Sequence, residues 1–256
     1  MSEVFCGTTQ ISNVNFSSLT EDTSELKVFQ IQLSSYYNLV PQLSEYLNAA
    51  ELQRARKYHF EKDNNQFIIT RSLLKFILAQ HSSVPVSEIN IEIDKNRKPH
   101  LASNPSVCFN VTHAKDYALI LVRDNNAVGI DVEFLNNDFD YSEMLKDIYS
   151  SQEIETVLNA TDKTHAFFKY WTRKEAIVKT TGIGISDFLP QIPAIDGHHE
   201  VPSRFLDGYK SIQILSFDLN KEYIASIALS GKSIDFNEFI IYNLPNTIEG
   251  LISFSS

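Results

Sequence analysis

The sequence predicts an α+β protein built from two packed units, in each of which helices precede strands. In the N-terminal half, residues 48–60 and 64–80 show helical patterns, and several strand-like runs follow them. In the C-terminal half, residues 163–181 show a helical pattern, and strand-like runs follow again. No low-complexity linker separates the halves, so we expect units 1–125 and 126–256 to pack tightly as one body.

The two helices of the first half have different signals. Residues 48–60, NAAELQRARKYHF, carry a basic face that includes Arg54. Asn48 is suited to be the N-cap of this helix, because its side chain can accept a hydrogen bond from the first turn. Residues 64–80 repeat apolar side chains at helical spacing and predict the second helix.

A short strand is expected after these helices. EINIEID alternates apolar and polar residues, which predicts a half-buried strand with Ile89, Ile91 and Ile93 facing inward. DKNRKP follows as a turn that Pro99 closes.

Three further strand-like runs cover residues 107–111, 117–123 and 128–134. Asp124 to Asn126, DNN, has the residue types of a turn between the last two runs. This arrangement predicts a meander of three consecutive strands.

The second half opens with helix signals. Ser150 and Glu153 have the spacing of a capping box, and the helix over 163–181 is expected to end at Gly182. Strand patterns return in SIQILSF and YIASIAL. The residues from Gln191 onward carry no chemistry that we can name and are expected to complete the second unit.

Composition excludes several classes of protein. A hydrophobic content of 43% and a charged content of 21% are typical of a soluble globular chain, and a net charge of −10 argues against nucleic acid as a partner. The cysteines, Cys6 and Cys108, stand alone, which fits a reducing compartment. No secretory signal or membrane-spanning run is evident, so we expect a cytoplasmic protein without membrane contact.

The run VGIDVEF, residues 128–134, places Gly129, Asp131 and Glu133 on one face of a strand. Two carboxylates about 6–7 Å apart at Cβ can reach one cation between them, and Mg²⁺ prefers such oxygen ligands. Gly129 leaves room beside them for something bulky. The competing interpretation is a solvated strand face.

The helix over 163–181 offers a matching stripe. Trp171, Glu175 and Lys179 recur every four residues and therefore share one helical face. Glu175 and Lys179 can equally form an ordinary helix ion pair worth about 0.2–0.5 kcal/mol. Trp171 on the same stripe favours a partly buried face, where both charges need partners.

Two further motifs hold polar groups with functional potential. FNVTHA ends a strand with Thr112 and His113, although a single histidine is more often structural. Lys98, in RKPHL, lies in a turn where a lysine is usually only solvated.

Together these motifs resemble a known family. FNVTHA, GIDVE and WTRKEAIVKTTGIGI, in this order, with RARKYHFEKD, RSLLKFIL and RKPHL upstream, are similar to 4′-phosphopantetheinyl transferases of the Sfp-like, surfactin-synthetase-activating type. The similarity covers residues 52–185. GIDVE alone is a weak signal, but its combination with W-x-x-K-E-x-x-x-K about forty residues later is specific.

The resemblance implies an enzyme that moves the phosphopantetheine arm of coenzyme A onto a serine of an apo acyl- or peptidyl-carrier protein. Adenosine 3′,5′-bisphosphate is released, and the carriers serve fatty-acid, polyketide or nonribosomal peptide synthesis. The family fold implies two similar lobes in a pseudo-twofold arrangement with the active site in the cleft between them. Residues 1–125 would then bind the 3′-phosphate and adenosine, and residues 126–256 the metal, diphosphate and carrier.

The resemblance also implies roles for single residues. Asp131, Glu133 and Glu175 would hold Mg²⁺, with Mn²⁺ as an alternative, and Lys179 would neutralise the diphosphate. The serine proton would go to Glu175, or to Glu133 through a metal-bound water, and we favour Glu175. The remaining coenzyme A ligands implied are Arg54, Lys98, Pro99, Thr112 and His113.

Three residues depart from the family pattern. Arg97 stands where glycine is frequent, and Thr112 stands where serine is commoner. Glu51 occupies a place where related enzymes carry a base for the 3′-phosphate, which weakens the assignment of Arg54.

Carrier docking and two alternative functions complete the expectations. Met144, Leu145, Ile148 and Tyr149 either form an apolar docking surface or, as we favour, face the core. The alternatives to a monomeric transferase are a Mg²⁺-dependent phosphohydrolase of coenzyme A-like diphosphates and an inactive relative that binds coenzyme A or a carrier.

Overall fold

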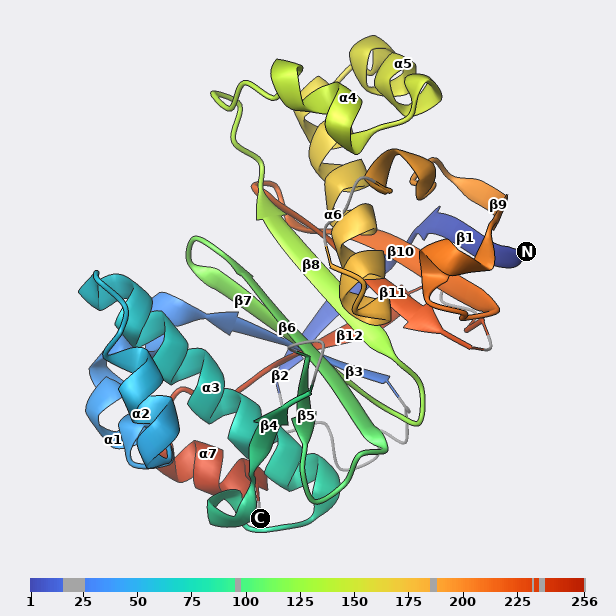
Figure 1. Ribbon diagram of the computed structural model, residues 1–256. Coiled ribbons are helices and arrows are strands. Elements are labelled where there is room, and N and C mark those ends of the chain that lie inside the picture. Colours follow the sequence, from blue (N-terminus) through green and yellow to red (C-terminus); the bar gives the residue numbers. More distant parts are fainter. Residues whose placement is uncertain (16–25, 95–97, 185–187, 232, 235–237, 256) are drawn as a thin grey trace.

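Two five-stranded sheets lie face to face, with helices covering the outer side of each sheet (Figure 1). The computed structural model describes residues 1–15, 26–94, 98–184, 188–231, 233–234 and 238–255. Within these residues the fold is of the α+β class, as the sequence predicts. No helix in the described ranges is long and apolar enough to cross a membrane.

The first sheet, which we call sheet I, has the strand order β2-β12-β3-β7-β6. Its strands are β2 (Gln10–Asn15), β12 (Glu238–Asn243), β3 (Leu26–Gln32), β7 (Tyr117–Asp124) and β6 (Val107–Ala114). The helices beside it are α1 (Val40–Ser44), α2 (Ala49–Ala55), α3 (Glu61–Ser82) and α7 (Ile248–Ser255). Apolar residues of α3 and α7 pack with those of β3, β6 and β7 in one core.

The second sheet, sheet II, has the order β8-β11-β10-β1-β9. Its strands are β8 (Val128–Phe134), β11 (Tyr223–Ser230), β10 (Ser211–Asn220), β1 (Ser2–Thr8) and β9 (Gly197–Val201). The helices beside it are α4 (Leu145–Ile148), α5 (Ser151–Asn159) and α6 (Lys163–Thr181). The inner faces of the two sheets share an apolar core that includes Ile130 and Val132 of β8.

The order of elements repeats between the sheets. In sheet I, β3 is followed by helices and then by the β6–β7 hairpin, and the strands lie in the order β3-β7-β6. In sheet II, β8 is followed by helices and then by the β10–β11 hairpin, in the order β8-β11-β10. All of these pairings are antiparallel, so the same unit of one strand, helices and a hairpin occurs twice.

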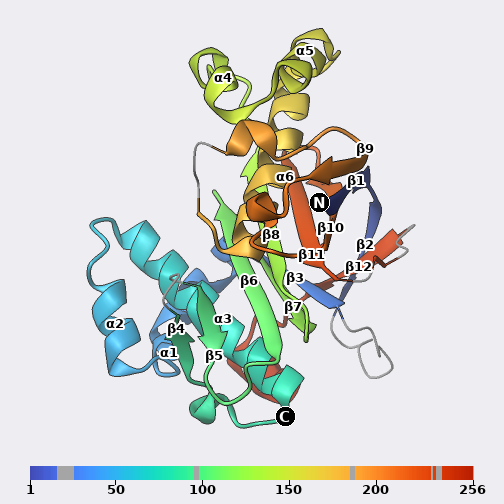
Figure 2. The ribbon, with the colours of Figure 1, turned by 45° about the vertical axis from the view of Figure 1, so that its right-hand side comes forward.

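The ends of the chain cross between the sheets. β1 pairs with β10 in sheet II, whereas β12 pairs with β2 and β3 in sheet I (Figure 2). Our expectation that the residues from Gln191 onward complete only the second unit is therefore wrong, because β12 and α7 pack on sheet I. A division at residue 125 therefore holds only for the middle of the chain. The N-terminal strand β1 belongs to sheet II, and the C-terminal elements β12 and α7 belong with sheet I.

The predicted meander is also wrong in its last step. β6 and β7 form a hairpin, but β8 leaves sheet I and joins sheet II beside β11. β8 then lies against β6, where side chains replace a backbone ladder: Asn110 Oδ1 accepts from the Ile130 amide at 2.9 Å, and Thr112 Oγ1 from the Val132 amide at 3.4 Å. These two bonds join the sheets next to the acidic face of β8.

The short strand of the first half is smaller than expected. Within the part of the chain that the structure describes, β4 (Ile91–Ile93) and β5 (Pro99–Leu101) form a two-stranded sheet of their own, and Ile89 is buried in the turn before it. Ile93 is 54% exposed rather than inward, because it lies at the open end of a two-stranded hairpin. The middle of the predicted turn, residues 95–97 of 94–99, lies outside the described residues, and at its ends the Asp94 amide donates to the Lys98 carbonyl oxygen at 3.0 Å.

Helix ends follow their local sequence signals. Asn48 with Glu51, and Ser150 with Glu153, form the two capping boxes of α2 and α5. α2 ends at Ala55, earlier than predicted. α6 has the predicted bounds, and Gly182 ends it at φ 74, a left-handed conformation that glycine adopts without strain.

Two buried cations fix α6 to its surroundings. Lys174 is fully buried and its Nζ lies 2.9 Å from Glu153 Oε2 of α5. Arg173, also fully buried, donates to Ser216 Oγ at 2.7 Å and pairs with Asp196 at 2.6 Å. Separating the Lys174–Glu153 pair, which is buried on both sides, would leave an uncompensated charge, and this favours one position of α6.

Gly129 allows α6 to lie directly on β8. A Cβ at this position would come 2.1 Å from the Ala176 carbonyl oxygen of α6 and 2.7 Å from the Thr180 amide nitrogen. The bulky group that the sequence predicted beside Gly129 is therefore the helix backbone rather than a ligand.

We expect Gly129→Ala to lower the free energy of unfolding by about 3 kcal/mol or more, because two backbones must separate to admit a methyl group. Urea denaturation checks this value. Gly7→Ala in β1 is the matched control, since the nearest atom at 3.0 Å is the end of the Phe5 ring, which can move. Equal losses of unfolding free energy in Gly129→Ala and Gly7→Ala would contradict the view that the backbone contact at Gly129 is the cause of the effect.

Candidate active site

The helix that carries Glu175 and Lys179 lies against the strand that carries Asp131 and Glu133. α6 packs on β8, and the stripe of Trp171, Glu175 and Lys179 faces the strand positions of Asp131 and Glu133. Trp171 Nε1 donates to Glu133 Oε1 at 3.0 Å, which fixes the orientation of that carboxylate. The close approach at Gly129 makes this contact between helix and strand possible.

Lys179 is the centre of the hydrogen bonds at this site. Its Nζ lies 2.6 Å from Asp131 Oδ1, 3.1 Å from the Ile130 carbonyl oxygen and 3.2 Å from Thr112 Oγ1. Thr112 also donates to Asp131 Oδ1 at 3.1 Å. Three elements, β6, β8 and α6, are therefore joined around one buried carboxylate.

Burial and mutual repulsion raise the pKa values of these acids. Desolvation raises the pKa of Glu133 to about 7, and the Asp131 charge adds to this effect. Desolvation, followed by the Asp131 charge, raises the pKa of Glu175 to about 7 as well. The pKa of Asp131 is also raised by its burial, although Lys179 opposes this shift. The single ammonium of Lys179 offsets only part of the negative charge that these three acids carry when ionised.

The donor chemistry fits a divalent cation. Asp131 Oδ2 and Glu175 Oε1 are buried and have no hydrogen-bond partner in the described part of the chain. Within that part, no three His, Cys, Asp or Glu side chains are close enough as they stand to hold a metal ion. Lys179 and Trp171 occupy one oxygen each of Asp131 and Glu133. Carboxylate oxygens left unpaired in this way are suitable Mg²⁺ ligands.

These pKa values predict how stability depends on pH. Because the folded-state pKa of Glu133 and of Glu175 lies above the ordinary 4.5, the folded state binds more protons than the unfolded state between pH 4.5 and 7. Their contribution to stability is full below about pH 4.5 and is lost as the pH rises through about 7. In EDTA, we therefore expect the Glu133→Gln/Glu175→Gln variant to lose less stability than the parent protein as the pH rises from 4.5 to 7.

Denaturant titrations at pH 5 and pH 8 check this expectation, and added Mg²⁺ should raise the melting temperature more at pH 8, where fewer protons compete for the carboxylates. An exposed acid, Glu155→Gln on α5, is the control. The same pH dependence in the double variant and the parent would contradict the assignment.

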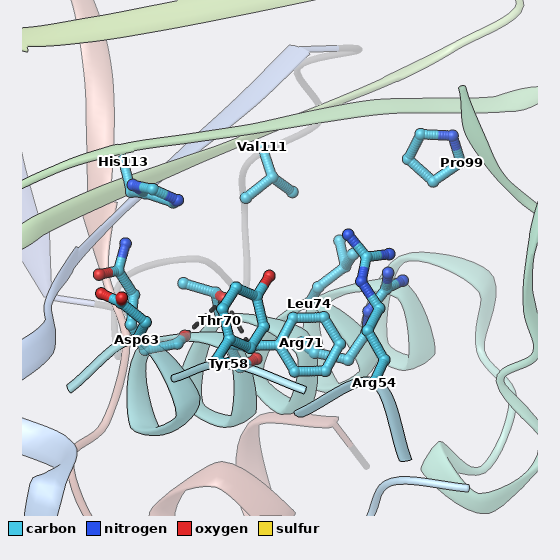
Figure 3. A pocket seen from close by; sticks show the side chains of 11 residues that line it. Arg54, Tyr58, Asp63, Thr70, Arg71, Leu74, Pro99, Val111 and His113 are labelled. Carbon is cyan, nitrogen blue, oxygen red and sulfur yellow. Dashed lines mark hydrogen bonds between the residues drawn. The ribbon is translucent and has the colours of Figure 1, made fainter. Parts of the chain in front are cut away.

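A pocket of about 240 Å³, which we call pocket 1, lies between α2, α3 and β6 (Figure 3). Three of the predicted coenzyme A ligands, Arg54, Pro99 and His113, line it. His113 and Asp63 lie at one end of the pocket and Arg54 and Pro99 at the other (Figure 3). Burial lowers the pKa of His113, and the nearby Lys179 lowers it further.

The other predicted coenzyme A ligands, Lys98 and Thr112 as well as Lys179, lie outside pocket 1. Lys98 Nζ donates to the Thr180 carbonyl oxygen at 3.1 Å, at the end of α6, where helix carbonyls lack internal donors. Burial lowers the pKa of this amine. Thr112 faces Asp131 and Lys179, whereas its neighbour His113 faces pocket 1, because side chains alternate across β6. β6 thus connects the acids to pocket 1.

Sequence reasoning missed Arg71, the second guanidinium of pocket 1. Arg54 Cζ lies 5.1 Å and Arg71 Cζ 5.7 Å from the centroid of the Phe67 ring. Arg71 Nη1 is buried and has no hydrogen-bond partner among the described residues. The available signal was its position four residues after Phe67 on a helix already predicted. The other residues of the pocket that we did not predict are Tyr58, Asp63, Gln66, Phe67, Thr70, Leu74 and Val111.

An apolar groove of about 350 Å³, which we call groove A, is lined in part by Glu133, one of the acids. Trp171 lines it beside Glu133, and Phe139, Met144 and Phe168 contribute apolar wall. The groove is completed by Ala114, Lys115, Phe134, Asn136 and Phe167. Lys115 Nζ lies 3.5 Å from the centroid of the Phe134 ring.

Of the four residues that could have formed an apolar docking surface, three face the core, as we favoured, and one does not. Leu145, Ile148 and Tyr149 are buried under α5 and α6. Met144 is 38% exposed and reaches groove A.

Comparison with known proteins identifies the class. Residues 127–228 match the 4′-phosphopantetheinyl transferase superfamily model, and residues 37–124 match the model of the N-terminal part of 4′-phosphopantetheinyl transferase. The chain is 30% identical over 173 residues to the 4′-phosphopantetheinyl transferase HetI of Nostoc sp., which covers 66% of this chain and 73% of HetI. It is 29% identical over 169 residues to psf-1 of Bacillus pumilus, covering 63% and 71%.

A 4′-phosphopantetheinyl transferase of Bacillus subtilis is 23% identical over 182 residues, covering 69% of this chain and 79% of that protein. The chain belongs to the 4′-phosphopantetheinyl transferase family, and it is an enzyme of that class.

Proposed function

We propose that this enzyme transfers the 4′-phosphopantetheine arm of coenzyme A to a serine of an apo acyl- or peptidyl-carrier protein and releases adenosine 3′,5′-bisphosphate. The observation that carries the proposal is the meeting of Glu175 and Lys179 of α6 with Asp131 and Glu133 of β8. Pocket 1, lined by His113 of β6, and groove A, lined by Glu133 of β8, give room for the two ends of coenzyme A.

The repeated unit of strand, helices and hairpin supports two similar lobes in a pseudo-twofold arrangement. We propose that sheet I with its helices forms the lobe for the 3′-phosphate and adenosine, and that sheet II with its helices forms the lobe for the metal, diphosphate and carrier. The active site then lies in the cleft at the β6–β8 junction, with β1 and β12 exchanged between the lobes.

Pocket 1 is proposed as the site of the 3′-phosphate. Arg54 and Arg71 bring two guanidiniums to it, which are suited to phosphate oxygens because their donors form a planar fork. His113 lies at the end nearer the acids and can donate a further hydrogen bond. Lys98 and Thr112 are proposed for phosphate oxygens between pocket 1 and the acids, since each lies beside α6.

Asp131, Glu133 and Glu175 are proposed to hold Mg²⁺, with Mn²⁺ as an alternative. When bound, such an ion neutralises charge on the diphosphate and fixes its geometry. The raised pKa values of these acids and the unpaired oxygens of Asp131 and Glu175 support this assignment.

The residues of this chain supply the rest of the chemistry. The serine oxygen attacks the β-phosphorus of coenzyme A, and the bond from that phosphorus to the bridging oxygen breaks, so the electron pair leaves with adenosine 3′,5′-bisphosphate. Glu175 takes the serine proton, which requires its carboxylate form. Lys179 stabilises the charge that develops on the diphosphate oxygens.

Groove A is proposed to take the carrier and the pantetheine arm. Because Glu133 and Trp171 line this groove, a serine that enters it would come beside the acids. Lys115 at its rim offers a cation to acidic carriers, which an enzyme with a net charge of −10 otherwise repels. Both pockets form within one chain, so we propose a monomer. Its unpaired cysteines suit the reducing cytoplasm.

The test is to incubate the enzyme with coenzyme A and Mg²⁺, with and without an apo-carrier, and to follow adenosine 3′,5′-bisphosphate by chromatography. We expect release only with the carrier, together with a mass gain of one phosphopantetheine on it. Release without a carrier would instead identify a phosphohydrolase. Binding without any release would identify an inactive relative.

A further inference from the structure

Glu51 is a buried acid next to a pocket whose proposed ligand is an anion. It lies in the first turn of α2 and is only 8% exposed. Its Oε2 accepts from the Asn48 amide at 3.0 Å and lies 3.0 Å from Lys75 Nζ of α3, while its Oε1 lies 3.7 Å from Arg71 Nε. A carboxylate in this position needs a physical explanation, since phosphate and carboxylate repel each other.

The partners of Glu51 remove most of this repulsion. Lys75 is 4% exposed, does not line pocket 1, and donates to the Tyr46 carbonyl oxygen at 2.9 Å. Its ammonium therefore neutralises the Glu51 charge behind the pocket wall. The guanidiniums of Arg54 and Arg71 are left as the positive charges of the pocket itself.

Glu51 also sets the position of Arg71. It contacts the Nε side of the guanidinium, and Nη1 remains without a hydrogen-bond partner in the described ranges. The same carboxylate caps α2, which carries Arg54 one turn later. The same acid thus pairs with the Arg71 guanidinium and caps the helix that carries Arg54, and both guanidiniums lie beside the Phe67 ring. A freely rotating arginine would lose more conformational entropy on binding a phosphate.

We infer that Glu51 is a positioning residue that orients Arg71 for the 3′-phosphate of coenzyme A, and that it thereby contributes to the preference for coenzyme A over dephospho-coenzyme A. The inference rests on the proposed function, because it takes pocket 1 as the site of that phosphate.

The test compares the two substrates in Glu51→Gln, which keeps an oxygen for the Asn48 amide but removes the charge. We expect the KM for coenzyme A to rise about tenfold with kcat unchanged, since one charge-assisted contact is misplaced. The KM for dephospho-coenzyme A should stay the same. In an Arg71→Gln background, Glu51→Gln should have no further effect on either substrate.

Glu45→Gln, at an exposed position before α2, is the control and should change neither KM. Thermal unfolding shows whether Glu51→Gln is folded. If it is not folded, Glu51→Asp is tested instead. Its shorter side chain places the carboxylate farther from Arg71, so we expect a smaller rise in the KM for coenzyme A and no change in the KM for dephospho-coenzyme A.

The failures can be told apart. Equal rises in KM for both substrates, or no rise for either, overturn the role of Glu51 while the proposed function stands. A parent enzyme that uses both substrates equally well overturns the assignment of pocket 1 and this inference with it. A parent enzyme that modifies no carrier overturns the proposed function itself.

Discussion

Glu175→Gln is expected to lower kcat for carrier modification by about 10²–10⁴-fold, the usual contribution of a positioned general base. The amide keeps the size of the side chain and one oxygen but cannot take the serine proton. The KM for coenzyme A should change by less than about threefold. Steady-state kinetics with a saturating apo-carrier separates the two constants.

Two observations sharpen this prediction. The unpaired Glu175 Oε1 makes the carboxylate available to a partner that the protein does not itself provide. With a pKa of about 7 before coenzyme A and metal bind, Glu175 can accept a proton near neutral pH. Glu155→Gln on the surface of α5 should be fully active. If kcat and coenzyme A affinity fell by the same factor, Glu175 would be chiefly a ligand and not the base.

Lys179→Met should lower kcat by about 10²–10³-fold and also destabilise the protein. The loss of activity follows from removing a cation aimed at developing negative charge. The loss of stability, about 3–5 kcal/mol, follows because Asp131 would keep a buried charge without its partner at 2.6 Å. Activity assays and denaturant titrations measure the two effects separately.

A second variant separates stability from catalysis. In Lys179→Met/Asp131→Asn the unpaired charge is absent, so most of the lost stability should return while activity stays low. If the double variant regained activity along with stability, Lys179 would act only through folding.

The stripe on α6 and the acids on β8 could be predicted because each depends on local periodicity. Trp171, Glu175 and Lys179 share a face in any helix, and Asp131 and Glu133 share a face in any strand. Caps such as Ser150 and Gly182 are likewise set by neighbours in the sequence. The residue types alone therefore indicated a divalent-cation site before the packing of the helix on the strand was known.

What could not be predicted depends on contacts between distant segments. β12 reaches sheet I and β1 reaches sheet II through pairings that span most of the chain. Arg71 lines pocket 1 together with Arg54 of α2, and the ion pair from Arg71 to Glu51 joins α3 to α2. Lys98 was expected to bind coenzyme A together with Arg54 and His113, but it lies outside pocket 1, where its Nζ donates to the Thr180 carbonyl oxygen at the end of α6.

Gly129 shows how a correct pattern can have a different cause. The alternation of β8 put a residue without a side chain beside two acids, which we took as space for a ligand. The space is filled by α6, and that close contact is what brings Glu175 and Lys179 to the strand. The glycine therefore serves the site indirectly, through the packing of its catalytic helix.

The most direct test of the account is a crystal structure with coenzyme A and Mn²⁺, in which the metal is located by its anomalous signal. We predict one anomalous peak, which lies between the diphosphate and the carboxylates of Asp131, Glu133 and Glu175. The peak should be absent from crystals of the Asp131→Asn variant. A metal bound elsewhere, with Glu175 turned to bulk solvent, would contradict the account.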